Sequence, residues 1–232
     1  MQNAFLIFEN LCPSWPSALH LGIRRRIPRG SEIFEPEAQT KGIFFITEGM
    51  VEIYLNTLQG PEQTLYFVGS KCIFGEVSCF VSGETSEASV RAREDCTLYF
   101  FSLETLQGPI ARQFPNLLLE LVQAAAYKIR GYSVLLHDSR ENDQTVRVVK
   151  MILNLISYKG LKPGKDEKRV ILKPGMTQND VAHLLGVHRV TVTKVIKTLK
   201  DKGIIKQFTR NKLEILDFPS LCRIVENAAA KN

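Results

Sequence analysis

Residues 177–200 read TQNDVAHLLGVHRVTVTKVIKTLK, a run that predicts two short helices joined at a glycine. Its first residue, Thr177, has an aspartate three positions later, which is typical of a capped helix start. Ala182 is small where two helices must cross closely, Gly186 can make the turn, and Val192 supplies an apolar core face. This spacing is that of a helix-turn-helix.

A hairpin with a basic tip is predicted directly after the second helix. Gly203 ends that helix, and the apolar runs 204–206 and 213–216 flank the tip, Arg210-Asn211-Lys212. A small hairpin in this place is a wing. The motif, the wing and the local positive charge together favour a protein that binds duplex DNA.

Charge is divided unevenly along the chain. Residues 1–139 hold 11 Lys and Arg against 15 Asp and Glu, whereas residues 140–232 hold 19 against 9. An acidic part joined to a basic part indicates two domains, of which the second binds a polyanion. Since no apolar run approaches the roughly 20 residues that span a bilayer, we expect a cytoplasmic protein with no membrane partner. The five cysteines are scattered and form no CxxC pair, which favours buried thiols over a zinc site.

Short β-rich runs alternate with glycines between residues 23 and 103. Examples are residues 43–46, 51–55, 64–68 and 97–101. Many short strands at this spacing predict an antiparallel sandwich or barrel. We place this domain at residues 1–110.

The pattern becomes helical after Gln107-Gly108-Pro109, and we predict one long helix within residues 111–138. Apolar side chains there step alternately by four and three: Leu118, Val122, Ala125, Ile129, Tyr132 and Leu136. This is the pattern of a coiled-coil seam, which either the β-domain or a partner helix must cover. We favour a partner helix, and therefore a homodimer. A second helix over residues 144–158 and a strand over residues 170–172 then lead into the helix-turn-helix, so the last domain is residues 139–232.

The second helix of the motif is expected to enter the major groove with its N-terminal residues near base edges. Arg189 can present a fork to guanine or clamp a phosphate, and Val190 suits a thymine methyl group. Side chains predicted at the DNA are Thr177, Gln178, His188, Arg189, Val190, Thr191, Thr193, Lys194, Arg210 and Lys212. The nearby Lys197 and Lys200 are read as solvated surface charges.

The order of a glycine-rich β-domain, a seam helix and a winged helix-turn-helix resembles the cyclic-AMP receptor/fumarate-nitrate regulator family. The resemblance is most specific at residues 45–51 (FITEGMV), 74–77 (FGEV) and 89–92 (SVRA), and in the helix-turn-helix. It implies an α+β fold with an N-terminal β jelly-roll similar to cyclic-nucleotide-binding domains. It also implies a dimeric bacterial transcription regulator, most often an activator that contacts RNA polymerase, in which a small effector repositions the DNA-binding helices.

Several positions depart from the family pattern. Members that bind cyclic nucleotides carry an Arg-Ser pair for the cyclic phosphate, whereas the aligned residues here are Ser86 and Glu87. A carboxylate repels a buried phosphate, which argues against cyclic AMP. The cysteine cluster of the iron–sulfur branch and the axial histidine of the haem branch have no counterpart, so no cofactor is expected.

The run Val190-Thr191-Val192 is similar to the halorespiration regulators of this family, which respond to chlorinated phenols and bind an A·T-rich palindrome. Lys128 aligns with their phenolate-sensing lysine, although it can also be read as a lysine reaching solvent from a dimer helix. We predict an effector pocket lined by Tyr66, Gly75, Glu76, Cys79, Ser86, Glu87, Lys128 and Tyr132.

Three other readings stay open at this point. A redox sensor would use Cys12 and Cys222, which lie outside the predicted core elements. A cyclic-nucleotide-responsive regulator would need another way to bind the phosphate. A cupin-type enzyme would need clustered metal ligands, but His20, His137, His183 and His188 are dispersed, so we expect no enzyme activity.

Overall fold

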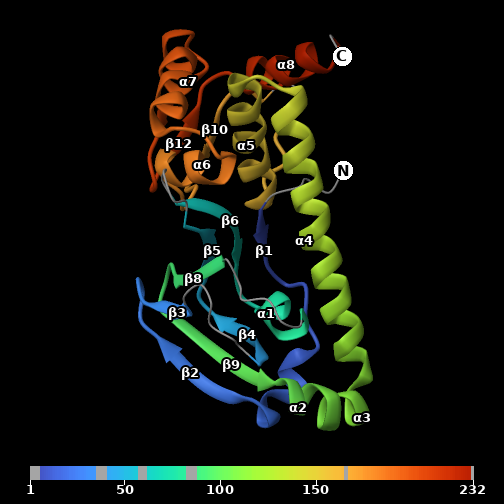
Figure 1. Cartoon of the computed structure of the whole chain (residues 1–232). Helices are drawn as coiled ribbons and strands as arrows, with labels where there is room; N and C mark the ends of the chain where they lie inside the picture. The colour runs from blue at the N-terminus through green and yellow to red at the C-terminus, as the bar shows by residue number, and fades with distance from the viewer. Residues whose placement is uncertain (1–5, 35–40, 57–61, 82–87, 165–166, 231–232) are drawn as a thin grey trace. The chain divides into compact units, whose positions relative to one another are not determined.

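The computed structural model describes residues 6–34, 41–56, 62–81, 88–164 and 167–230 (Figure 1). The chain forms two compact units, Leu6–Arg130 and Gly131–Asn232, and the boundary between them falls within one long helix. Each unit has its own apolar core. No described helix has both the length and the apolar character needed to cross a bilayer.

The N-terminal unit is built from two β-sheets. One has the strand order β1-β6-β5-β8-β3 and the other β2-β9-β4-β7. Their bounds are β1 Ile7–Phe8, β2 Ile23–Ile27, β3 Glu32–Phe34, β4 Gly42–Glu48, β5 Val51–Leu55, β6 Gln63–Val68, β7 Cys72–Phe74, β8 Ala88–Ala92 and β9 Cys96–Ser102. Their pairings are antiparallel except that of β1 with β6, which is parallel.

Aromatic side chains fill the core of this unit beneath a short N-terminal helix. Trp15 is fully buried, stacks on Phe45 and meets Phe101 edge-on, with ring centroids 6.0 and 5.1 Å away. The helical elements of the unit are η1 Trp15–Leu21, α1 Glu76–Phe80, α2 Leu103–Thr105, the π-helix η2 Leu106–Ile110 and α3 Ala111–Gln113. Gly75 begins α1 at φ 89°, a conformation that favours glycine.

The long helix α4, Pro115–Glu141, has two apolar faces. One face buries Leu117, Leu121 and Ala124 in the core of the N-terminal unit. The other exposes side chains of the predicted seam, with Val122 at 64% and Ile129 at 67% of their full accessible area. The N-terminal unit therefore covers the stripe next to the predicted seam and leaves the centre of the seam open.

The C-terminal unit packs helices on a small sheet. The helices are α5 Gln144–Tyr158, α6 Gln178–Leu185, α7 Arg189–Asp201 and α8 Phe218–Ala229, and the strands β10 Val170–Leu172, β11 Ile205–Phe208 and β12 Leu213–Ile215 form a sheet in the order β10-β12-β11. The core includes Ile152, Ala182, Val192 and Ile215, which are fully buried.

The predicted α+β class, the helix-turn-helix and the wing are confirmed. The predicted helix over 144–158 and strand over 170–172 match α5 and β10. The long helix extends three residues beyond the predicted end at residue 138, to Glu141. The sequence analysis had no element for α8 or β1.

Candidate nucleic-acid interface and effector site

The helix-turn-helix is held at its start and at its turn by local hydrogen bonds. Thr177 accepts a hydrogen bond from the Asp180 amide at 3.1 Å, and the Asp180 carboxylate accepts one from the Thr177 amide at 2.7 Å. Both halves of a capping box are thus present. Gly186 then takes a left-handed conformation, φ 62° and ψ 40°, and its amide donates to the His183 carbonyl. The glycine is needed there because other residues rarely adopt this conformation.

Helix α7 separates an apolar core face from a polar exposed face. Val192, Val195, Ile196 and Leu199 are buried. The exposed side chains are His188, Arg189, Val190, Thr193, Lys194 and Lys197, while Thr191 is half-buried. Val190 keeps 61% of its accessible area. Within the part of the chain that the structure describes, Arg189 and Lys194 have no ion-pair partner, so their charges are available to an outside anion.

Gln178 and Thr177 are engaged inside the protein. The Gln178 amide nitrogen donates to the Phe208 carbonyl of the wing at 3.2 Å, and its oxygen accepts from the Thr193 hydroxyl at 3.1 Å. The Thr177 hydroxyl donates to Asp180 at 2.9 Å. Gln178 therefore joins the wing to α7, a role that the sequence pattern did not reveal. Phosphate binding by Gln178 and Thr177 stays a prediction.

A buried arginine, Arg147 of α5, holds the turn of the motif. Its guanidinium donates to the carbonyl of Leu185, the last residue of α6. A cation at this helix end is favourable because the terminal carbonyls carry partial negative charge. Burial lowers the pKa of Arg147, and the charge of Asp138 acts against this.

The wing gathers three cations around one carboxylate. Glu214 of β12 is fully buried and lies 2.6 Å from Arg169, 2.8 Å from Lys212 and 3.9 Å from Lys206. Hydrogen bonds from Lys212 and Arg169 lower the pKa of Glu214 to about 2. The wing therefore keeps surplus positive charge. Lys212, predicted to bind phosphate, is half-exposed and paired, and Arg210 at the tip is partly exposed.

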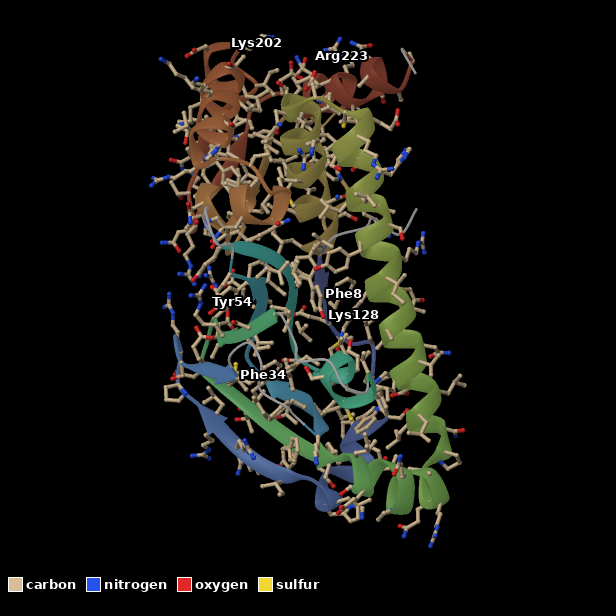
Figure 2. All side chains as sticks on the ribbon, in the orientation of Figure 1. Phe8, Phe34, Tyr54, Lys128, Lys202 and Arg223 are labelled. Atoms are coloured by element: carbon tan, nitrogen blue, oxygen red, sulfur yellow. The ribbon has the colours of Figure 1, made fainter. Side chains whose placement is uncertain are left out.

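Two of the predicted effector residues, Glu76 and Tyr66, meet at Lys128 of α4, which Figure 2 labels on the side of the helix facing the β-strands. Its ammonium donates to Glu76 Oε1 at 2.5 Å and to the Ile73 carbonyl at 2.7 Å. It also lies 5.5 Å from the centroid of the Tyr66 ring. Only 4% of Lys128 is exposed, so it does not reach solvent. The carboxylate of Glu76 raises the pKa of Lys128 against the opposing effect of burial.

One buried oxygen at this ion pair is unsatisfied. Within the described residues, Glu76 Oε2 has no hydrogen-bond partner. Burial raises the pKa of the neighbouring Tyr66 to about 12, so its ring stays neutral. The structure thus brings together a cation, a carboxylate with spare accepting capacity and an aromatic ring.

The other predicted pocket residues lie at α1, further along α4 or outside the described residues. Gly75 and Cys79 lie at the start and within α1, and Cys79 belongs to the core beneath α4. Tyr132 is half-buried one turn after Lys128, in the C-terminal unit. Ser86 and Glu87 lie outside the described residues.

The redox reading assumed that Cys12 lies outside the core elements, and this is wrong. This residue is fully buried in the core of the N-terminal unit because η1 and α4 cover it, whereas Cys222 on α8 is half-buried. The expectation that the cysteines are mostly buried is confirmed for Cys12, Cys72, Cys79 and Cys96.

Comparison with known families identifies both parts of the chain. Residues 24–113 match the cyclic nucleotide-binding domain, and residues 146–224 match the Crp-like helix-turn-helix domain. The chain is 26% identical over 201 residues to the cyclic AMP receptor protein of Thermus thermophilus, covering 86% of this chain and 88% of that protein. It is 22% identical over 180 residues to the cAMP-activated global transcriptional regulator CRP of Salmonella typhimurium, covering 78% and 83%.

Solved structures share the same fold. A CooA variant from Carboxydothermus hydrogenoformans superposes with a TM-score of 0.78 at 20% identity, covering 96% of this chain and 99% of that one. CprK complexed with OCPA gives 0.77 at 19% identity, covering 95% and 97%. Together the two domain matches cover most of the chain. They place an effector-type β-domain first and a DNA-binding helix-turn-helix after it. The chain therefore belongs to the cyclic-AMP receptor/fumarate-nitrate regulator family of DNA-binding transcription regulators.

Proposed function

We propose that the chain is a homodimeric transcription activator whose DNA affinity is controlled by a small organic anion, such as a phenol or an aromatic acid, rather than by a cyclic nucleotide. The observation that carries this proposal is the buried pair of Lys128 and Glu76. A buried ion pair is costly to desolvate, and one that leaves an oxygen unsatisfied is more so. Such a site suits a ligand that can complete it.

A phenolic ligand supplies the missing partner. Its hydroxyl can donate to Glu76 Oε2, or its phenolate can accept from the Lys128 ammonium, while the Tyr66 ring offers an aromatic contact. CprK, whose fold is similar, was solved with o-chlorophenolacetic acid. A cyclic phosphate fits less well, because Glu87 stands where related receptors carry a phosphate-binding residue.

The proposed dimer is supported by the open face of α4. Val122, Ile129 and Leu136 repeat at seven-residue spacing and each exposes more than half of its area, at 64%, 67% and 55%. A partner helix covers such a stripe in a coiled coil. Two α7 helices then bind half-sites roughly 34 Å apart, one turn of duplex DNA. Contact with RNA polymerase is the further expectation for an activator.

Base recognition is assigned to the start of α7. Arg189 is the candidate for a bidentate contact with guanine, and Val190 for contact with a thymine methyl group. His188, Thr191, Thr193 and Lys194 complete the surface on α7. Arg210 and Lys212 of the wing, with Thr177 and Gln178 at the start of α6, are assigned to the DNA backbone.

The central experiment measures ligand binding and DNA binding on the same protein. Purified dimer is screened by thermal shift against small aromatic acids, phenols and cyclic nucleotides, and DNA affinity is then measured with each stabilising compound. We expect a phenol or aromatic acid to raise the melting temperature and tighten DNA binding at least tenfold.

Lys128→Met should lose this response, whereas Arg130→Met, an exposed change on the same helix, should keep it. A response to cyclic AMP alone would instead favour the cyclic-nucleotide reading, which the match to the cyclic nucleotide-binding domain keeps as the second candidate.

Sedimentation of Ile129→Glu tests the dimer, because a buried carboxylate at the seam should give monomers. A variant that remains dimeric would contradict the assigned interface.

A further inference from the structure

Two cysteines of the N-terminal unit, Cys12 and Cys72, lie side by side although 60 positions separate them in the sequence. The chain after β1 continues alongside the chain after β6, since the Gly69 amide donates to the Phe8 carbonyl at 2.9 Å. The Cys12 amide then donates at 2.9 Å to the carbonyl of Lys71, the residue before Cys72. This bond places the backbone of Cys12 beside that of Cys72.

The spacing suits a disulfide bond. Backbones joined side by side by such hydrogen bonds lie roughly 4.8 Å apart, within the range of about 4.4–6.8 Å found between the Cα atoms of bridged cysteines. The side chains are also close enough for each thiol to affect the pKa of the other. Little backbone movement is therefore needed to join them.

The surroundings favour one thiol as the nucleophile. The interaction with Cys12 and the nearby charge of Lys128 lower the pKa of Cys72, while the interaction with Cys72 and burial raise the pKa of Cys12. A thiol whose pKa is lowered, beside a second thiol, is the arrangement in which oxidation stops at a disulfide. Both side chains are fully buried, so reaction requires the segment that holds Cys12 to open locally.

We propose that Cys12 and Cys72 form a reversible intrachain disulfide with a hydroperoxide as the oxidant, and that this bond changes the site around Lys128. The Cys72 thiolate attacks the peroxide, the O–O bond breaks, and the alkoxide leaves with a proton as alcohol. Cys12 then attacks the sulfenic sulfur of Cys72, the S–O bond breaks and water leaves. Two thiols lose two electrons and the peroxide gains them.

The new bond would act directly on the proposed effector site. Lys128 donates to the carbonyl of Ile73, the residue after Cys72, so a shift of Cys72 moves one of the two acceptors of the ammonium. This consequence rests on the proposed function, but formation of the disulfide does not. The pair also differs from the redox reading of the sequence, which named Cys12 and Cys222 as the candidate cysteines.

The test treats the full-length protein with hydrogen peroxide under native conditions and counts free thiols. We expect five free thiols per chain to fall to three, and peptide mapping without reductant to find Cys12 linked to Cys72. Dithiothreitol should restore all five. Cys12→Ser and Cys72→Ser should each abolish the cross-link, whereas Cys96→Ser, which removes another buried thiol, should keep it.

Five unchanged thiols, oxidation beyond sulfenic acid without a cross-link, or a cross-link to Cys222 would each overturn the pairing.

Local opening is tested separately by repeating the reaction in non-denaturing urea, which should accelerate it. The effect on Lys128 is measured as DNA affinity of the cross-linked and reduced protein, for which we expect at least a threefold difference. An equal affinity would refute the link to Lys128, and a wild-type protein that binds no duplex would refute the proposed function while leaving the thiol result intact.

Discussion

The two units of the molecule treat positive charge in opposite ways. In the N-terminal unit Lys128 is buried and held by one carboxylate and one carbonyl. On α7 of the C-terminal unit, Arg189 and Lys194 are exposed. No described residue forms an ion pair with either of them. Exposed cations cost little and can meet a phosphate or base edge immediately, whereas a buried cation is costly and is retained where it specifies a conformation or a ligand. The contrast separates a sensing site from a binding surface.

Removal of the buried cation tests this contrast most severely. Lys128→Met leaves the Glu76 carboxylate buried without its partner, so we expect a loss of about 3–5 kcal/mol in unfolding free energy. Denaturant unfolding of the N-terminal unit measures it. The paired variant Lys128→Met with Glu76→Gln should recover most of the loss. A single variant as stable as the wild type would show that the pair is not effectively buried.

Removal of an exposed cation should leave stability unchanged and reduce DNA binding. Arg189→Ala should lose about 1–3 kcal/mol of specific binding, or roughly 5- to 150-fold in Kd, because its guanidinium can bond a guanine edge. Gel-shift titration against a duplex selected by the wild-type protein measures this. Lys202→Ala, at the far end of α7, is the control. Wild-type affinity of the arginine variant would exclude a role at the DNA.

A change of side-chain type at the next position should alter preference more than affinity. Val190→Glu replaces an apolar group with one that accepts a hydrogen bond from cytosine N4, so selection should move towards a G·C pair by about 1 kcal/mol at one position. Binding-site selection from random duplexes with both proteins measures the shift. Identical selected sites would contradict the proposed contact with a thymine methyl group.

The smallest effect concerns the wing, where exposed cations surround a buried carboxylate. Hydrogen bonds from Lys212 and Arg169 hold the pKa of Glu214 at about 2, below its ordinary value of 4.5. The unfolded chain therefore takes up this proton first as the pH falls, and the stabilisation present above pH 4.5 is lost between 4.5 and about 2. Glu214→Gln should flatten the acid limb of the stability profile in that window. An unchanged limb would show that the wing cations do not stabilise the carboxylate.

Local patterns were sufficient for most of the C-terminal unit, although they did not predict α8. The cap at Thr177, the glycine at 186 and the apolar positions on α7 act over a few residues, so the helix-turn-helix could be predicted without knowledge of the fold. The same holds for α5 and β10. The wing followed from two apolar runs and a basic turn. Gln178 shows the limit of this reasoning, because its partners at Phe208 and Thr193 depend on how the wing packs.

The faces of α4 show why periodicity alone is ambiguous. The seam through Val122 and Ile129 was visible in the sequence, but a second stripe through Leu117 and Leu121 lies beside it. Both repeat at helical spacing, and only the tertiary structure decides which of them the rest of the N-terminal unit covers. The open stripe is the one at which a partner helix is proposed.

What the sequence determined by itself was the fold class, the family and the DNA-binding motif, since these depend on the order and spacing of residue types. What only the tertiary structure decided was the environment of individual groups. It turned Lys128 towards Glu76 rather than solvent, and it buried Cys12 beside Cys72 rather than leaving it near the surface. Both outcomes depend on contacts between residues more than 50 positions apart, and neither hydrophobic periodicity nor local charge encodes such contacts.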